Sequence, residues 1–114
     1  MSEKRYAEVV VGLPIEGPFD YAIPTNLSKQ IQVGMRVWVP FRNRKLVGYV
    51  VGFVDRPRVK KRIKEIYLNL DTEAIISPEM LKLTRWIADY YFCSWGEAIE
   101  ATIPQTLKRG KRLS

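Results

Sequence analysis

The chain has 114 residues, of which 46% are hydrophobic, enough for one small folded domain and too many for a disordered tail. Its single cysteine excludes an internal disulfide, and we therefore expect a reducing, cytoplasmic setting. The lack of histidine excludes a Ser-His-Asp triad and a Cys/His zinc site. No apolar stretch is long enough to span a membrane. The net charge of +7 is concentrated in residues 29–64, where eleven Lys/Arg accompany one acid, Asp55, and the charge is +10.

Alternating and Val-rich runs between turn residues predict a series of antiparallel strands in the first 70 residues. The expected strands span residues 6–12, 19–23, 35–39, 46–54 and 62–70. In the fourth of them, Gly48 and Gly52 share one face, which predicts sharp coiling or close approach of another backbone. The pattern therefore predicts a small coiled antiparallel β-barrel.

The strand expected at 35–39 is half-buried, because Arg36 and Trp38 lie on the face opposite to three apolar residues. Trp38 would then be exposed beside a cation, an arrangement that suits stacking on a nucleic-acid base. Alternatively, Trp38 packs under the basic loop at 42–45. The sequence leaves both interpretations open.

The pattern changes to helical after Ser77, which is a good N-cap and is followed by Pro78 and Glu79 in the first turn. An apolar face follows at helical spacing, and we expect it to pack against the barrel. It consists of Met80, Leu83, Thr84, Ile87, Tyr90 and Tyr91. We expect this helix to end at Trp95-Gly96 and a second, short helix to span 97–103. The predicted α+β domain covers residues 1–105, and residues 106–114 are expected to form a basic linker toward further domains.

Asp20 is a lone carboxylate between two aromatic residues, Phe19 and Tyr21, early in a basic chain. Near a phosphate-binding surface, such an acid would recognise a hydroxyl or a base edge, because it repels phosphate. Alternatively, it belongs to a Pro-Phe-Asp turn and accepts hydrogen bonds from nearby backbone N–H groups. A third interpretation pairs Asp20 with Glu16 as ligands of a divalent metal in a nuclease, for which two carboxylates across a Pro-containing turn are weak evidence.

Lysine and arginine side chains of the middle segment are the candidates for contact with phosphate, although acidic lipid or an acidic protein would satisfy the same charge. They are Arg42, Arg44, Lys45, Arg58, Lys60, Lys61, Arg62 and Lys64. The chain has no Gly-rich phosphate loop followed by Lys and Ser/Thr, and no imidazole base. These features indicate a binding module with no catalytic or metal-ligating residues.

Short motifs through nearly the whole chain are similar, in order and spacing, to those of a known family. They lie at 9–14 (VVVGLP), 18–24 (PFDYAIP), 33–41 (VGMRVWVPF), 47–52 (VGYVVG), 63–66 (IKEI) with Asp71, 86–91 (WIADYY), Gly96 and 102–104 (TIP). Each motif is weak alone, whereas the set is specific. The chain thereby resembles the N-terminal domain of the PriA family, bacterial replication-restart helicases also called primosomal protein N′.

The resemblance implies a domain that binds the 3′ end of the nascent leading strand at a stalled or abandoned fork during primosome assembly. The family's end pocket uses a Phe-Asp pair and a lysine, which match Phe19, Asp20 and Lys64. Arg42 stands where the family often has glycine, and it would either narrow the pocket or reach a phosphate. The side chains expected to contact the DNA backbone are Arg44, Lys45, Lys61 and Arg62.

The resemblance also implies which partners and cofactors to expect. The partners are DNA with a free 3′ end, forked DNA and, through the full-length protein, other primosome proteins and single-stranded DNA-binding protein, with no membrane. ATP, magnesium and zinc are expected only in the absent domains that make the family ATP-dependent 3′–5′ DNA helicases. The alternative is a protein-docking module of a larger nucleic-acid enzyme, with Trp86, Tyr90 and Tyr91 as its surface if they are exposed.

Overall fold

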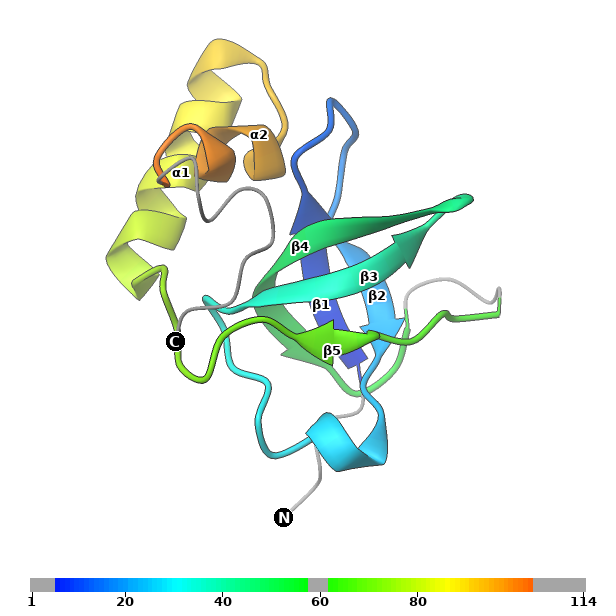
Figure 1. Ribbon diagram of the computed structural model, residues 1–114. Helices are drawn as coiled ribbons and strands as arrows, with labels where there is room; N and C mark the ends of the chain where they lie inside the picture. Colours follow the sequence, from blue (N-terminus) through cyan, green and yellow to red (C-terminus); the bar gives the residue numbers. More distant parts are fainter. Residues whose placement is uncertain (1–5, 58–61, 104–114) are drawn as a thin grey trace.

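An antiparallel sheet built from the first half of the chain is covered on one side by two helices from the second half (Figure 1). The computed structural model describes residues 6–57 and 62–103. The elements are β1 (Tyr6–Val11), β2 (Phe19–Ala22), the 3-10 helix η1 (Thr25–Leu27), β3 (Arg36–Phe41), β4 (Arg44–Val54), β5 (Leu68–Asn69), α1 (Pro78–Tyr91) and α2 (Trp95–Glu100). The α+β class with one long and one short helix is confirmed, whereas the linker predicted at 106–114 lies outside the described residues.

The five strands form one antiparallel sheet in the order β2-β1-β4-β3-β5. Its two edge strands, β2 and β5, do not pair with each other along their length. A single parallel bridge between Ala22 and Glu65 joins the β2 edge to the segment that leads into β5. The sheet is therefore strongly curved but not closed, and the predicted barrel is not confirmed.

The strand predicted at 62–70 is wrong over most of its length, because β5 contains only Leu68 and Asn69. The segment before β5 donates backbone hydrogen bonds to two different strands from two consecutive residues. The Ile66 N–H donates to the Ala22 carbonyl of β2 at 3.1 Å, and the Tyr67 N–H donates to the Trp38 carbonyl of β3 at 2.8 Å. A chain that crosses between two strands in this way satisfies its backbone groups without forming a continuous ladder.

The face of β3 that the sequence predicted to be exposed is only partly so, because Arg36 is buried whereas Trp38 and Pro40 are half-buried. Val37 and Val39 pack inside the curved sheet, as expected. On the other face Arg36 is 0% exposed, and its guanidinium contacts the Asp71 carboxylate, with Nη2 2.7 Å from Oδ1. The backbone N–H of Arg36 also donates to Asp71 Oδ2 at 3.0 Å. Arg36, one of the cations of residues 29–64, is therefore part of the core and does not contribute to the charged surface.

At Gly48 of β4 the space for a side chain is filled, by a side chain of β1 and not by its backbone. It stands opposite Val11 of β1 and Val37 of β3, and a side-chain Cβ at this position would collide with the side chain of Val9. Glycine is therefore required here by the space between the strands.

The helix α1 begins as predicted, with the Ser77 hydroxyl accepting a hydrogen bond from the Met80 N–H at 3.1 Å. Its predicted packing face is correct only in part, because Thr84 is buried and Met80 and Ile87 are half-buried, whereas Leu83, Tyr90 and Tyr91 are exposed. The buried side chains are Leu81, Thr84 and Ala88, and the helix packs mainly against α2. Among the described residues, no helix is long and apolar enough to cross a membrane.

The end of α1 and the start of α2 also differ from the prediction. Phe92 ends α1 in the left-handed conformation with φ 56°, and Ser94 then caps α2. A capping box fixes this start, since the Ser94 hydroxyl accepts from the Glu97 N–H and the Glu97 carboxylate accepts from the Ser94 N–H. Trp95 is thus the first residue of α2 and not part of a break, and the helix ends at Glu100 and not at residue 103.

Candidate nucleic-acid interface

A hollow of about 540 Å³ lies between β2, the β3–β4 turn and the segment that precedes β5. Phe19 and Asp20 reach it from β2, Arg42 from the turn, and Lys64 from the preceding segment. The structure thus brings together all four residues that the sequence predicted for an end pocket. We call this hollow the end pocket.

The apolar wall of the end pocket is made by two aromatic rings. Phe19 and Phe41 meet edge to face, with their centroids 5.4 Å apart. Behind them, the Tyr21 hydroxyl donates to the Pro40 carbonyl at 2.7 Å, which ties β2 to β3 across the curve of the sheet. Burial raises the pKa of Tyr21 to about 12, so this hydroxyl keeps its proton and continues to donate at neutral pH.

The charged rim of the end pocket has one acid among three cations. Asp20 is half-buried and is the one carboxylate among the described residues that line the pocket. The cations are Arg42, Arg62 and Lys64. The Lys64 ammonium donates to the Arg42 carbonyl at 3.4 Å, so it is held against the turn. An end group that offers both a hydrogen-bond donor and a nearby phosphate matches this arrangement of charges.

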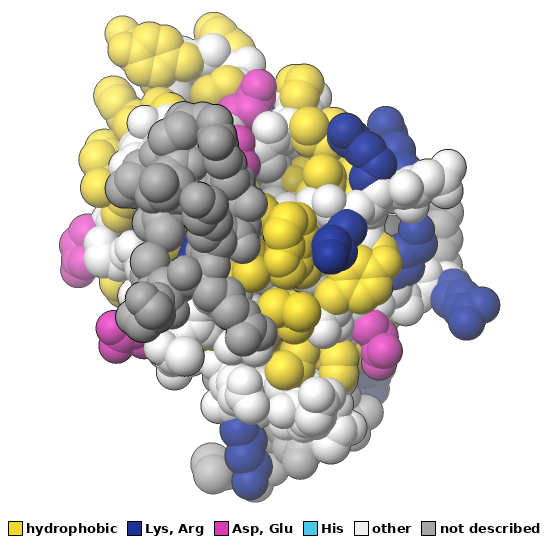
Figure 2. Space-filling view, viewed as in Figure 1, with side chains coloured by type: hydrophobic (Ala, Val, Ile, Leu, Met, Phe, Trp, Pro, Cys, Tyr) yellow, Lys and Arg dark blue, Asp and Glu magenta, His cyan; other side chains and the backbone are white. Residues whose placement is uncertain are grey.

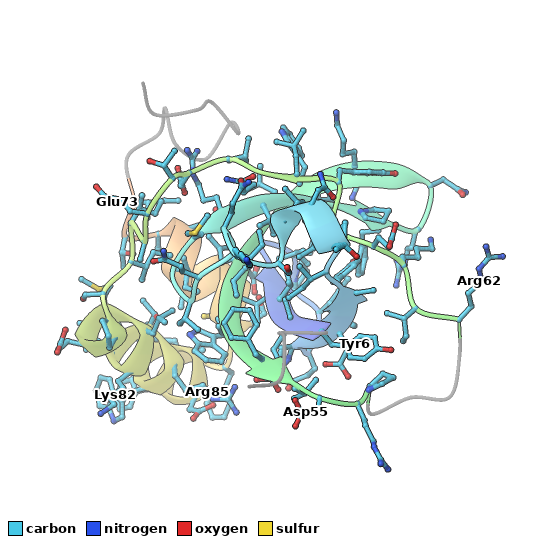
Figure 3. All side chains as sticks on the ribbon, turned by 90° about the horizontal axis from the view of Figure 1, so that it is seen from below. Tyr6, Asp55, Arg62, Glu73, Lys82 and Arg85 are labelled. Carbon is cyan, nitrogen blue, oxygen red and sulfur yellow. The ribbon has the colours of Figure 1, made fainter. Side chains whose placement is uncertain are left out.

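A larger groove of about 1200 Å³ adjoins the end pocket and shares Arg42, Arg62 and Lys64 with it. Arg44 and Lys45 also line this groove, and its one acid among the described residues is Glu65. We call it the basic groove, defined by these five cations. Figure 2 shows Lys and Arg side chains gathered on this side of the molecule, and Figure 3 shows Arg62 directed away from its body. Lys61, Arg58 and Lys60, which were also predicted to contact phosphate, lie outside the described residues.

Arg42 occupies a backbone position that favours glycine. Phe41 and Arg44 are paired, so Arg42 and Asn43 form a two-residue hairpin turn, in which Arg42 has φ 58°. Of the two central residues only Arg42 has a positive φ, as in a type II′ turn, whose first central position is usually glycine. The Arg42 guanidinium lies 5.3 Å from the centroid of the Phe41 ring, at the rim of the end pocket. Position 42 therefore combines a strained backbone with a cation beside the pocket.

Replacing Arg42 by glycine is expected to raise the free energy of unfolding by roughly 0.5–1 kcal/mol, because the left-handed conformation no longer costs steric energy. Arg42→Ala is the matched control, since it removes the same cation and keeps the Cβ. Urea denaturation of both variants measures the effect. An alanine variant stabilised as much as the glycine variant would show that the cation, and not the backbone, is the source of the cost.

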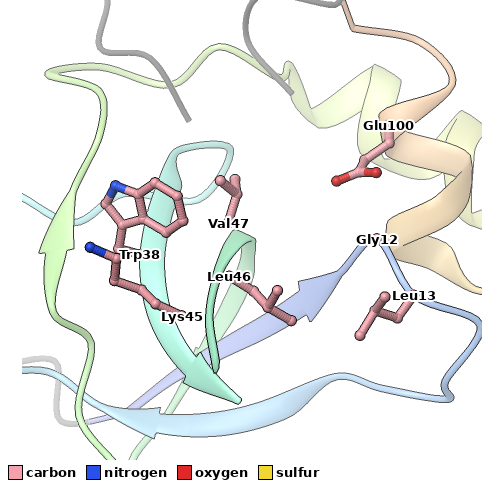
Figure 4. A pocket seen from close by; sticks show the side chains of 7 residues that line it. All are labelled: Gly12, Leu13, Trp38, Lys45, Leu46, Val47 and Glu100. Atoms are coloured by element: carbon pink, nitrogen blue, oxygen red, sulfur yellow. The ribbon is translucent and has the colours of Figure 1, made fainter. Parts of the chain in front are cut away.

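Trp38 is half-buried and packs against the cluster beneath the helices. The Lys45 ammonium lies 4.9 Å from the centroid of its ring and covers one face. Figure 4 shows both side chains at a separate hollow of about 260 Å³, with Glu100 on its opposite side. Of the two interpretations of Trp38, packing beneath the residues at 42–45 therefore fits the structure. Lys45 borders both this hollow and the basic groove.

Glu16 and Asp20 do not line a common hollow. Glu16 borders cavities next to α1 and α2, whereas Asp20 borders the end pocket. In the described part of the chain, no three His, Cys, Asp or Glu residues form a group that could hold a metal ion. The paired-carboxylate interpretation therefore finds no support in the geometry.

Sequence reasoning missed several residues that shape the end pocket. Gly17, Pro18, Tyr21, Pro40, Phe41 and Ile63 also line it. The signal was present, since most of them lie in the motifs at 18–24 and 33–41. Those motifs suggested a pocket only through Phe19 and Asp20, because side chains without charge give no indication of a site until the fold brings them together.

The comparison with known families identifies the whole of this surface as part of one domain. Residues 8–104 match the family model described as the 3′ DNA-binding domain (3′BD). The matched range contains every described residue of the end pocket and the basic groove.

Curated relatives carry the name "Replication restart protein PriA". The protein of Bacillus subtilis (strain 168) is 36% identical over 108 residues, which cover 91% of this chain and 13% of the relative. The protein of Haemophilus influenzae is 31% identical over 108 residues, covering 94% and 14%. That of Treponema pallidum (strain Nichols) is 32% identical over 114 residues, covering 96% and 17%. The chain thus spans about one seventh of the length of these relatives.

Proposed function

The chain belongs to the 3′ DNA-binding domain family, and from this we propose that it binds DNA strands through their free 3′-hydroxyl ends. The terminal nucleotide occupies the end pocket, and the preceding phosphates follow the basic groove. The observation that carries the proposal is the position of Asp20, the acid of a pocket whose other charged side chains are Arg42, Arg62 and Lys64.

Asp20 distinguishes a strand end from an internal nucleotide. A terminal 3′-hydroxyl donates a hydrogen bond to the carboxylate, whereas the phosphate that replaces it in an internal nucleotide has no donor and is repelled. Hydrogen bonds that involve a charged group are worth about 1.5–3 kcal/mol, so one such contact supplies a large preference. The Phe19 and Phe41 rings offer an apolar wall that any base can contact, so the pocket recognises the end without selecting a sequence.

The basic groove supplies affinity without sequence preference. Its five cations, Arg42, Arg44, Lys45, Arg62 and Lys64, release counterions from the DNA when they contact phosphates. The groove adjoins the pocket, so one strand can occupy both. Arg42 is shared by the two, and its guanidinium reaches the last phosphate while its backbone forms the turn.

Binding is expected to weaken steeply as salt is added. If each of the five groove cations contacts one phosphate, the logarithm of the association constant falls with the logarithm of salt concentration with a slope of about −3.5. Fluorescence anisotropy with a labelled single strand measures the slope. Arg44→Gln should make it shallower by about 0.7, and Lys29→Gln, outside both hollows, should leave it unchanged. Equal effects of the two variants would contradict the assignment of the groove.

The same proposal extends to the longer protein. We infer that the chain is the end-binding part of a cytoplasmic replication-restart helicase, which recognises the nascent leading strand at stalled or abandoned forks. ATP, magnesium and zinc bind to other domains of such a protein, and primosome proteins and single-stranded DNA-binding protein act through it. The names of the curated relatives support this inference.

We also propose that the curved sheet has the form of a small barrel. The bridge between Ala22 and Glu65 supports it, because it joins the β2 edge to the segment that carries Lys64. This connection holds two sides of the end pocket at a fixed separation.

A titration with forked DNA tests the proposed function as a whole, and absence of binding at moderate salt would favour a protein-docking module instead.

A further inference from the structure

Tyr67 is an exposed aromatic residue of the basic groove. It is 54% exposed, and it lines the groove together with the five cations that define it. The other large hydrophobic residues that are exposed in the described part of the chain lie on α1 or directly after it, and none of them lines the groove. Aromatic side chains among cations are typical of surfaces that bind single-stranded nucleic acid, because every base has a face that can stack.

The ring of Tyr67 is not covered by another ring or by a cation of the described residues. Its neighbour Trp38 differs in this respect, because the Lys45 ammonium covers one face of the indole ring. On α1, Trp86 and Tyr90 stack on each other, with centroids 5.2 Å apart. Of these rings, Tyr67 therefore offers a base a face that is not already in use.

The backbone on both sides of Tyr67 is fixed by the sheet. The Tyr67 N–H donates to the Trp38 carbonyl of β3 at 2.8 Å. The preceding residue, Ile66, is buried, and the following residue, Leu68, is paired with Trp38. A tyrosine on such a support loses the freedom of only two side-chain torsions when a base stacks on it, so the entropic cost is small.

Tyr67 is close to the end pocket along the chain. Lys64 lines both the end pocket and the basic groove, and the three residues from Lys64 to Tyr67 span at most about 11 Å. Successive nucleotides of one strand advance by at least about 3.4 Å, so this span corresponds to about three nucleotides or fewer. A strand whose terminal nucleotide occupies the end pocket therefore has one of its next bases within reach of the Tyr67 ring.

We propose that Tyr67 stacks on an unpaired base that lies a few nucleotides before the 3′ end, an inference that rests on the proposed function of the end pocket. The cations of the basic groove contact the phosphates of the strand, and the Tyr67 ring contacts one of its bases. Within a duplex, the faces of that base are covered by the neighbouring base pairs. The chain therefore selects a 3′ end whose last few nucleotides are single-stranded.

Substitutions of Tyr67 test the contact, with fluorescence anisotropy of a labelled single strand of about 12 nucleotides as the measurement. Tyr67→Ala should weaken binding about tenfold, from the energy of stacking on one base. Tyr67→Phe and Tyr67→Trp should keep the affinity, because the contact needs a ring and not the hydroxyl. The salt dependence of Tyr67→Ala should equal that of the wild type, since no charge is removed. The matched control is Tyr91→Ala, which removes an exposed tyrosine outside both hollows and should leave binding unchanged.

Abasic nucleotides placed one at a time near the 3′ end locate the base that contacts Tyr67. In the wild type, an abasic site at one position within about three nucleotides of the terminal one should weaken binding about tenfold. The same abasic site should cost Tyr67→Ala little more, because each change removes the same contact. Lengthening an unpaired 3′ overhang of a duplex from one to about four nucleotides should strengthen binding by the wild type more than by Tyr67→Ala.

Two results would overturn the inference. The first is equal binding by Tyr67→Ala and the wild type. The second is that the losses from Tyr67→Ala and from abasic sites add at every position, since the stacked base would then lie elsewhere. Circular dichroism checks the fold, and Tyr67→Leu, which keeps an apolar side chain without a ring, has the same expected loss should the alanine variant not fold. Failure of the end-binding proposal is read separately, because the wild type would then show no preference for a 3′-hydroxyl over a 3′-phosphate.

Discussion

Replacing Asp20 by asparagine is expected to remove most of the preference for a 3′-hydroxyl over a 3′-phosphate. The substitution keeps the size of the side chain and removes the charge that accepts from the hydroxyl and repels the phosphate. From the strength of a charge-assisted hydrogen bond, we expect a wild-type preference of about tenfold to a hundredfold and a variant preference of only a few-fold. Competition between two oligonucleotides of one sequence, differing only in the 3′ group, measures it.

The matched control for this experiment is Glu65→Gln, which removes the acid of the neighbouring groove. It changes the net charge by the same amount and should improve binding of both oligonucleotides slightly without changing their ratio. If Asp20→Asn and Glu65→Gln shift the ratio equally, long-range electrostatics and not end recognition explains the preference. Urea denaturation of both variants excludes a loss of fold as the cause.

Replacing Asp71 by alanine is expected to lower the free energy of unfolding by about 3–5 kcal/mol, because it removes the carboxylate that pairs with the buried Arg36 guanidinium. A loss of this size is a large fraction of the stability of a small domain. Urea denaturation followed by circular dichroism measures it.

An Arg36→Met/Asp71→Leu double variant separates the charge from the packing. Apolar residues of similar volume often replace a buried ion pair at little cost, so the double variant should be more stable than Asp71→Ala alone. Its free energy of unfolding will not reach the wild-type value, because the backbone N–H of residue 36 loses its acceptor on Asp71, which costs about 1–3 kcal/mol. A loss below about 1 kcal/mol in Asp71→Ala would contradict the role of the pair.

Local patterns predicted most of the fold. The strands near 6–12 and 46–54 and the Ser77 cap follow from alternation and capping chemistry. The errors arise where a distant partner decides the outcome. Alternation placed Arg36 at the surface, whereas Asp71, far along the chain, gives it a buried partner.

The helix α1 shows a different limit of periodicity. Two apolar faces coexist on it, and the sequence pattern favoured the larger, aromatic one. Packing buried Leu81, Thr84 and Ala88, of which the pattern had included only Thr84. The helix packs mainly against α2, where the Trp95 indole N–H donates to the Thr84 hydroxyl at 3.1 Å. A hydrophobic pattern indicates which residues avoid water but not which surface they cover.

The candidate site was predicted through resemblance more than through chemistry. Phe19, Asp20, Arg42 and Lys64 come from three separate segments, and the fold brings them to one pocket. The resemblance left open whether Arg42 narrows the pocket or reaches a phosphate. The structure adds a backbone reason why glycine suits this position, because φ 58° favours glycine whether or not DNA is present.

A crystal structure of the chain with a short single strand that ends in a free 3′-hydroxyl tests the central claim most directly. We expect the terminal 3′ oxygen within hydrogen-bonding distance of the Asp20 carboxylate, the last base against the Phe19 and Phe41 rings, and the preceding phosphates along the basic groove. A strand that follows the groove while its 3′ end lies outside the pocket, with no contact to Asp20, would contradict it.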